Sequence, residues 1–98
     1  MTSEADIEKA FVRYVEDTYD FPCLKLRIDG QQGFPDRTVI TPVGLFFIEF
    51  KKGNNKLEPA QRKWKRRLTR LNQTCVAANS VEAAVSIFDA WLNGSDPS

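Results

Sequence analysis

The sequence contains no histidine, and this absence excludes several kinds of site at once. Without an imidazole, the chain can form neither a serine–histidine nor a cysteine–histidine nucleophilic pair, and it has no histidine with which to bind zinc. Any metal ion would therefore be bound through oxygen atoms. Oxygen ligands favour Mg²⁺, Mn²⁺ or Ca²⁺.

Cysteines and long apolar runs are also scarce. Cys23 and Cys75 are the only cysteines, and both lie in apolar stretches, so we expect buried thiols and not a disulfide. The first six residues are acidic and polar, unlike a signal peptide, and no apolar run approaches the roughly 20 residues of a membrane helix. A length of 98 residues with 28% charged residues is typical of one soluble domain. We expect a single cytoplasmic domain over residues 1–98, with a frayed tail at residues 94–98.

Charge is unevenly distributed along the chain. The formal net charge is only +1, but residues 51–70 hold nine basic residues and one acidic residue, a net charge of +8. The remaining residues hold five bases and twelve acids. A basic block in an otherwise acidic chain indicates a polyanionic partner.

Hydrophobic periodicity predicts the element order α-β-β-β-α-β-α. Apolar residues recur at helical spacing over residues 3–18, after the N-cap candidate Ser3. Six further patterns are typical of strands or helices. They predict strands at 23–28, 37–40, 45–51 and 74–78 and helices at 59–72 and 81–92. The third strand is apolar on both faces and should be central. The basic helix that follows is long enough for a crossover, which would make the last two strands parallel. We therefore expect an α/β fold with a small mixed sheet flanked by helices.

Two carboxylates and a lysine are predicted to meet at the end of the central hairpin. Asp36 precedes the second strand, and Glu49 and Lys51 close the third. Side chains two apart on a strand point to the same side, roughly 6.5 Å apart along the backbone. Glu49 and Lys51 alone could form an ordinary surface ion pair, which contributes about 0–1 kcal/mol. Together with Asp36 and the basic block, they indicate a metal-dependent phosphodiester hydrolase.

Two other groups of charged residues leave alternatives open. Glu4 and Glu8 share one face of the first helix, where they could be solvated or could lean toward the site. The basic helix is partly a solvated face, but its charge density favours contact with backbone phosphates.

Trp64 and Trp91 are expected in the core or in an interface. The candidate DNA-binding residues are Lys25, Arg27, Lys52, Lys56, Arg62, Lys63, Lys65, Arg66 and Arg67.

Three short motifs resemble a known family. They are Gly33-Phe34-Pro35-Asp36, Ile48-Glu49-Phe50-Lys51 and Leu57-Glu58-Pro59-Ala60-Gln61. This combination resembles the PD-(D/E)XK nucleases, and specifically the VRR-NUC (virus-type replication-repair nuclease) branch, over residues 4 to about 88. The resemblance implies a restriction-endonuclease-like core.

The resemblance also implies roles for individual residues. Asp36, Glu49 and the main-chain carbonyl of Phe50 would bind Mg²⁺ or Mn²⁺, and Lys51 would be the catalytic lysine. Gln61 would support the site from the following helix. The family also uses a glutamate on the first helix, for which Glu8 is the first choice and Glu4 the rival.

Finally, the resemblance implies a context in DNA repair and replication. Short single-domain members, often viral, resemble homodimeric resolvases of four-way (Holliday) junctions, which would place a viral protein in the host cytoplasm. We therefore predict a metal-dependent, structure-selective DNA endonuclease that resolves four-way junctions as a homodimer. The alternatives are a flap-type nuclease and a non-catalytic nucleic-acid-binding or adaptor module.

Overall fold

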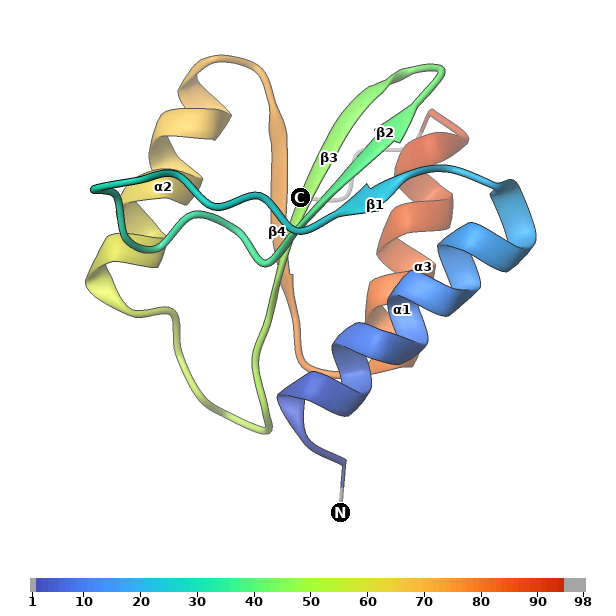
Figure 1. Ribbon diagram of the computed structural model, residues 1–98, viewed down its shortest axis with the longest axis horizontal. Helices are drawn as coiled ribbons and strands as arrows, with labels where there is room; N and C mark the ends of the chain where they lie inside the picture. Colours follow the sequence, from blue (N-terminus) through green and yellow to red (C-terminus); the bar gives the residue numbers. More distant parts are fainter. Residues whose placement is uncertain (1, 95–98) are drawn as a thin grey trace.

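The computed structural model describes residues 2–94, so residues 95–98 of the predicted tail lie outside the described residues (Figure 1). The elements are α1 (Glu4–Tyr19), β1 (Cys23–Leu24), β2 (Arg37–Thr41), β3 (Gly44–Phe50), α2 (Pro59–Arg70), β4 (Thr74–Ala78) and α3 (Val81–Leu92). This order confirms the predicted α/β fold. No helix within the described residues has the length and apolar content needed to cross a bilayer.

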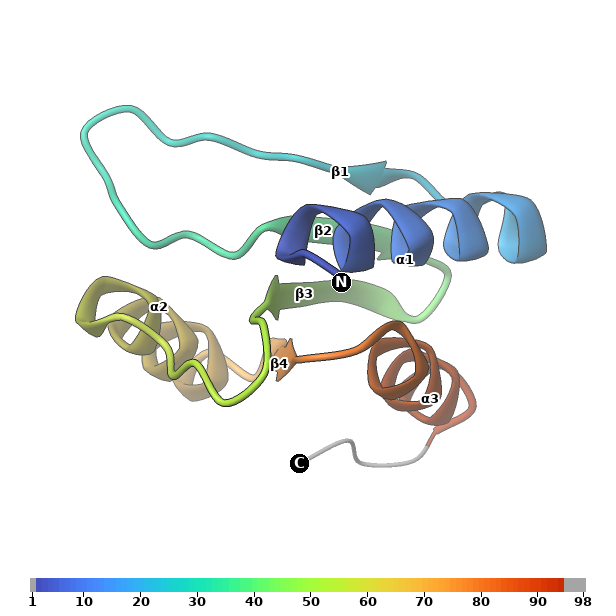
Figure 2. The ribbon, with the colours of Figure 1, turned by 90° about the horizontal axis from the view of Figure 1, so that it is seen from below.

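The four strands form one mixed sheet in the order β1-β2-β3-β4. β1 and β2 are antiparallel, as are β2 and β3, whereas β3 and β4 are parallel and joined through α2. Figures 1 and 2 show α2 on one face of the sheet and α1 and α3 on the other. The central position of β3 and the parallel crossover are both confirmed. The residues that close β3 therefore lie between a hairpin partner and a crossover partner.

The main core lies between the sheet and the helices α1 and α3. The apolar stripe of α1 contributes Ile7, Phe11 and Val15, as its helical spacing predicts. Phe11 packs against Phe50 with ring centroids 5.6 Å apart. The aromatic and aliphatic side chains that are fully buried here are Phe11, Phe46, Phe50, Phe88, Ile48, Val15 and Val39.

A smaller core lies under α2, on the opposite face of the sheet. Phe47, Leu68 and Cys75 are its buried members, and Phe34 and Trp64 pack against them. Because α2 covers this face, β3 is buried on both sides over its last five residues. Cys23 and Cys75 are free and buried, as predicted, and burial raises the pKa of each thiol to about 11.

The predicted strand at residues 23–28 is wrong in length, because only Cys23 and Leu24 pair with β2. Leu24 lies opposite Thr38, so the ladder would have to continue toward Asp36. The main-chain N–H of Asp36 instead donates to the Glu49 side chain, which ends the pairing. The chain from residue 25 to residue 36 leaves the sheet and runs toward α2 (Figure 1).

One carboxylate links the end of α1 to α3. Asp89 accepts hydrogen bonds from the phenol of Tyr14 at 2.7 Å and from the phenol of Tyr19 at 2.9 Å. These hydrogen bonds to Asp89 raise the pKa of both tyrosines, because they favour the protonated phenols. Asp89 therefore holds together two elements that are distant in the sequence.

We expect Asp89→Ala to lower the free energy of unfolding by about 2–3 kcal/mol, because two partly buried phenols lose a charged acceptor. Urea unfolding followed by circular dichroism measures this loss. Asp89→Asn is the matched control, since it keeps one acceptor oxygen and should lose less. Equal unfolding midpoints for Asp89→Ala and the wild type would contradict the prediction.

Candidate active site

Asp36 and Glu49 are held side by side by two hydrogen bonds between Asp36 and the end of β3. β2 and β3 pair with Arg37 opposite Ile48, so the residues beside this pair also meet. The Oδ2 atom of Asp36 accepts from the main-chain N–H of Phe50 at 2.9 Å. The Oε1 atom of Glu49 accepts from the main-chain N–H of Asp36 at 3.1 Å. The predicted meeting of these two carboxylates is therefore present in the structure.

Gln61 reaches the same site from α2. Its Nε2 atom donates to Oε2 of Glu49 at 2.7 Å, and its Oε1 atom accepts from the main-chain N–H of Glu58 at 2.7 Å. Glu58 is the N-cap of α2 and Pro59 is its first residue, as the sequence predicts. The first turn of α2 therefore holds the side-chain amide of Gln61 against Glu49. Glu49 is buried, with only 6% of its surface exposed to solvent.

Gly33 allows the 25–36 loop to approach this first turn. Its φ is +82°, and a Cβ built on it would lie 2.4 Å from the carbonyl carbon of Ala60 and 2.6 Å from the nitrogen of Gln61. Only glycine fits such a close backbone contact. The Gly-x-Pro-Asp motif thus supplies both the contact with α2 and the carboxylate of Asp36.

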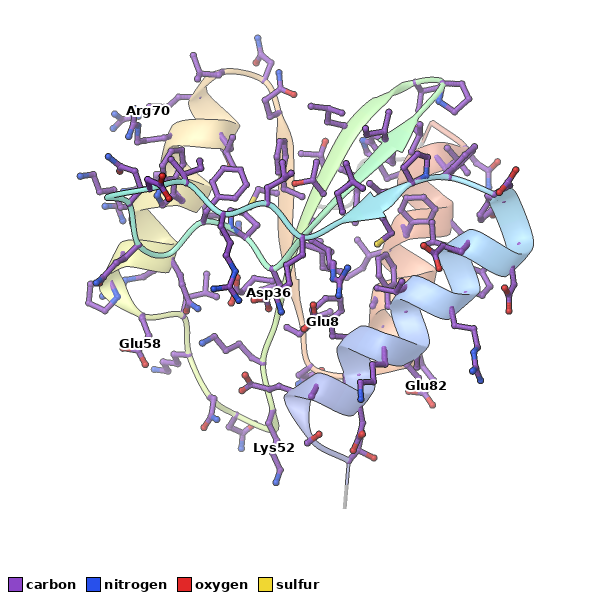
Figure 3. The ribbon with its side chains drawn as sticks, viewed as in Figure 1. Glu8, Asp36, Lys52, Glu58, Arg70 and Glu82 are labelled. Atoms are coloured by element: carbon purple, nitrogen blue, oxygen red, sulfur yellow. The ribbon has the colours of Figure 1, made fainter. Side chains whose placement is uncertain are left out.

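The structure separates the two glutamates of α1. Glu8 lies close enough to Asp36 for its charge to raise the pKa of Asp36, and Figure 3 shows both side chains between α1 and α2. Glu8 is held by Arg37, whose Nε donates at 2.6 Å, and by Lys25 at 3.5 Å. Glu4 instead accepts from the main-chain N–H of Lys52 at 3.1 Å. Glu8 is thus the α1 carboxylate beside the site.

Arg37 was not among the predicted site residues. It also donates through Nη1 to the carbonyl of Cys23 at 3.2 Å, so it joins Glu8 to β1. Its place directly after Asp36, at the first residue of β2, was the only signal in the sequence. A basic side chain beside a predicted carboxylate is a common pattern, and its partner on α1 becomes visible only in three dimensions.

Lys51 follows the last residue of β3 and is partly buried. Its main-chain N–H donates to the carbonyl of Ala78 at 2.9 Å, which fixes it to the end of β4. Its ammonium group is near enough to Glu49 to lower the pKa of that carboxyl. The predicted grouping of Asp36, Glu49 and Lys51 with Gln61 and Glu8 is therefore seen in the structure, whereas their chemical roles remain predictions.

The two carboxyl groups have raised pKa values. Burial is the main cause for both, and the charge of Asp36 further raises the pKa of Glu49, to about 8. Two neighbouring carboxylates that are largely withdrawn from water cannot both ionise at low cost unless a cation compensates them. The pair therefore has the electrostatic character of a cation site.

The donor set fits a hard divalent cation. Asp36 and Glu49 offer oxygen atoms alone, as Mg²⁺ and Mn²⁺ require. Among residues 2–94, no three acidic, cysteine or histidine side chains are grouped closely enough to hold a metal by themselves. Mg²⁺ is commonly bound by only one or two carboxylates together with water and substrate phosphates, so two suffice.

Asp36→Asn should stabilise the metal-free protein at pH 8.5 by about 1–3 kcal/mol, because it removes one of two repelling charges and lets an amide face Glu49. In the wild type, both carboxyl groups have pKa values above those of the unfolded chain. The stability that their protonated forms contribute is therefore fully present below about pH 4 and is lost as the pH rises toward 8. The variant should show a flatter pH dependence. Urea unfolding in a chelator at pH 5 and pH 8.5 measures both. Asp29→Asn removes an exposed loop charge and is the control. Parallel pH profiles for Asp36→Asn and the wild type would contradict this expectation.

The predicted DNA-binding residues fall into two groups. Lys25 is engaged by Glu8, and Arg27 lies in the same loop. The others lie on α2 or the loop before it, and Figure 3 marks the two ends of this helix with Glu58 and Arg70. Every ion pair between side chains in residues 2–94 involves Glu8, so the basic side chains of α2 have no acidic partner there. A groove of about 560 Å³ runs along the helix and is lined by Leu57, Arg62, Lys65, Arg66, Thr69 and Arg70.

This chain resembles several solved structures, among them the following two. One, described as "VRR_NUC domain", has a TM-score of 0.81 at 24% sequence identity, with 93% of this chain and 99% of that chain covered. Another, described as "VRR_NUC domain protein", has a TM-score of 0.71 at 16% identity, with 98% and 92% covered. No family model and no curated protein match the sequence. The chain has the VRR_NUC fold. The resemblance inferred from its motifs is thus confirmed at the level of the fold.

Proposed function

We propose that the protein is a metal-dependent deoxyribonuclease that hydrolyses phosphodiester bonds. The observation that carries this proposal is the pair of a half-buried Asp36 and a buried Glu49, which are joined by the hydrogen bond from the main-chain N–H of Asp36 to Glu49 and lie near Lys51. The VRR_NUC fold supports it, because the two similar structures are described as VRR_NUC domains, a name that refers to nucleases. A basic helix beside the pair would bring the polyanionic substrate to it.

Each residue of the site has a proposed role. Asp36, Glu49 and the carbonyl of Phe50 would hold Mg²⁺ or Mn²⁺, which when bound supplies a Lewis acid and lowers the pKa of a bound water. Glu8, predicted as a further ligand, is not grouped with both carboxylates closely enough to share the ion directly, and it would act on the ion through water. Lys51 would orient the attacking water and stabilise the negative charge that develops on the phosphate. Gln61 would keep Glu49 in its orientation through the 2.7 Å hydrogen bond. Arg37 would do the same for Glu8.

The basic surface supports sequence-independent binding of DNA. Side chains such as Lys63, Arg66 and Arg70 project from a helix that carries no acid within its bounds. Arg67 lies over the ring of Trp64, 4.8 Å from its centroid, which orders the guanidinium. We propose that these cations contact backbone phosphates of branched DNA, and that a homodimer presents two such sites to the two strands of a four-way junction.

A second candidate function is a non-catalytic nucleic-acid-binding module. The observation that favours it is that both oxygens of Glu49 already accept hydrogen bonds, from Asp36 and Gln61. Such a pair could be structural. This module would bind DNA in a salt-sensitive manner without any need for metal.

Cleavage assays distinguish the two candidates. Four-way-junction, flap and linear duplex DNA would be incubated with Mg²⁺, with Mn²⁺ or with a chelator, beside the Asp36→Asn variant. We expect cleavage of branched DNA only with metal and only by the wild type, with paired nicks in a junction if the dimer acts. Binding without cleavage of any substrate would support the non-catalytic module. Preference for the flap over the junction would replace the resolvase assignment.

A further inference from the structure

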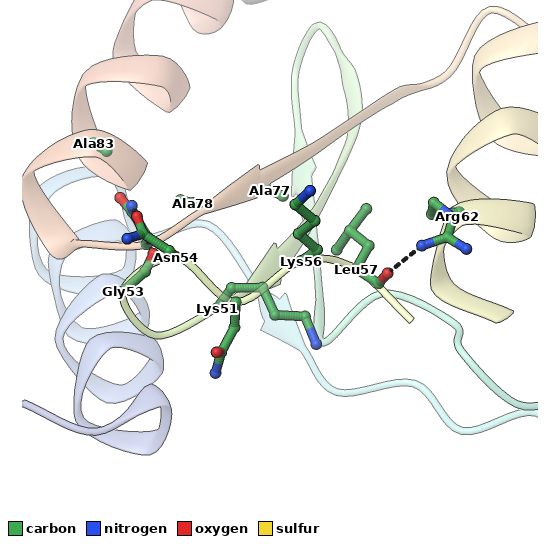
Figure 4. A pocket seen from close by; sticks show the side chains of 11 residues that line it. Lys51, Gly53, Asn54, Lys56, Leu57, Arg62, Ala77, Ala78 and Ala83 are labelled. Carbon is green, nitrogen blue, oxygen red and sulfur yellow. Dashed lines mark hydrogen bonds between the residues drawn. The ribbon is translucent and has the colours of Figure 1, made fainter. Parts of the chain in front are cut away.

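An open cavity of about 560 Å³ is lined in part by Lys51 (Figure 4), and it shares Leu57 and Arg62 with the groove along α2. It lies between the loop that joins β3 to α2, the end of β4 and the start of α3. This volume is within the range of roughly 300–1,000 Å³ found for small-molecule sites. The cavity is therefore large enough for a nucleotide but not for a duplex.

The charges around the cavity favour an anion. Lys51, Lys56 and Arg62 line it, and no acidic residue does. None of these three cations has a salt bridge within residues 2–94. Ala83, in the first turn of α3, also lines the cavity, so the positive end of the α3 dipole faces the same space.

The uncharged part of the lining favours more than a bare phosphate. The amides of Asn54, Asn55 and Asn79 can both donate and accept hydrogen bonds, as the edge of a base requires. The methyl groups of Ala77 and Ala83 provide apolar surface, against which a base can pack. A phosphate alone would need neither.

Hydrogen bonds fix the cavity before any ligand binds. The Nδ2 atom of Asn79 donates to the carbonyl of Gly53 at 3.1 Å, which ties the loop to the end of β4. The Nη1 atom of Arg62 donates to the carbonyl of Leu57 at 2.7 Å, which ties the loop to α2. A preformed site loses less conformational entropy on binding.

We propose that this cavity binds an unpaired nucleotide next to the scissile phosphate, and this rests on the proposed nuclease function. Lys51 belongs to both the cavity and the candidate active site. A nucleotide in the cavity would therefore lie next to a phosphate bound at the candidate active site. A base within a duplex is stacked and paired, and extracting it costs free energy that is least where the base is already unpaired. The cavity thereby provides a physical basis for selecting branched over linear DNA.

The test uses 2-aminopurine, whose fluorescence rises when it leaves a base stack. The probe is placed at the branch point of a flap substrate and at the matching position of a linear duplex, and binding is measured in a chelator so that no cleavage occurs. We expect an increase of about threefold or more on the flap with the wild type. The double variant Asn54→Ala/Lys56→Met should lose the increase in fluorescence. The slope of its binding constant against salt concentration should also be shallower, because about one counterion fewer is released on binding. Lys9→Met removes the same charge from the exposed surface of α1 and should behave as the wild type.

The possible outcomes separate this inference from the proposed function. A wild type that cleaves flap DNA with Mg²⁺ but gives no fluorescence increase would overturn the nucleotide cavity alone. An increase that persists in Asn54→Ala/Lys56→Met would place the extruded base elsewhere and would also overturn it. An increase that the double variant loses, in a protein that cuts no substrate, would support the cavity while refuting the nuclease.

Discussion

Lys51→Ala should lower the rate of metal-dependent cleavage by about 10²–10³-fold, because it removes a cation that lies close to Glu49. Such a group acts on charge that develops during the reaction, so kcat should fall while KM changes little. The loss of one cation near the substrate should weaken DNA binding only slightly. Single-turnover cleavage of branched DNA, together with binding measured in a chelator, gives both quantities.

Lys52→Ala is the matched control for this variant. Lys52 is the next residue and carries the same charge, but its side chain is exposed and Figure 3 shows it at the far edge of the loop, beyond Glu8. A general loss of positive charge would affect both variants equally. Comparable rates for Lys51→Ala and Lys52→Ala would remove Lys51 from the catalytic group.

Gly33→Ala should lower the free energy of unfolding by about 2–4 kcal/mol. The new Cβ would meet backbone atoms of Ala60 and Gln61 at 2.4–2.6 Å, and backbone cannot rotate away as a flexible side chain can. The first turn of α2 must then shift, and with it the amide of Gln61 that contacts Glu49. Chemical denaturation measures the stability, and cleavage assays should show a loss of activity in the molecules that remain folded.

Gly30→Ala provides the comparison. Gly30 lies in the same loop with a similar φ of +74°, but a Cβ there would meet nothing within 4 Å. It should therefore lose only the backbone term, about 1 kcal/mol. The difference between the two variants isolates the contact between Gly33 and α2. Equal losses would mean that this contact contributes nothing.

Much of the fold was predictable because its signals are local. The helical spacing of Ile7, Phe11 and Val15 and the N-cap Ser3 are read within one element, and the structure has both. The two-sided apolar pattern of β3 also predicts its central place. The length of β1 was not predictable, because Leu26 and Ile28 alternate as in a strand although the backbone of Asp36 has another partner.

In the candidate site, too, some contacts were predictable from the sequence and others were not. Asp36 and Glu49 could be paired from the sequence because a short hairpin sets their register. The choice between Glu4 and Glu8 could not be made, since it depends on how α1 is rotated over the sheet. The meeting of Asn79 with Gly53 likewise depends on the crossover through α2. No local pattern encodes either contact.

The exchange of hydrogen bonds between Asp36 and β3 couples the construction of the site to closure of the β2–β3 hairpin. In a folding intermediate in which that hairpin is open, the carboxylates of Asp36 and Glu49 are apart and neither is held by these hydrogen bonds. If the protein has the proposed activity, a newly synthesised or partly unfolded chain would thus be unable to cleave DNA. Competence to cut would arrive only with the finished fold.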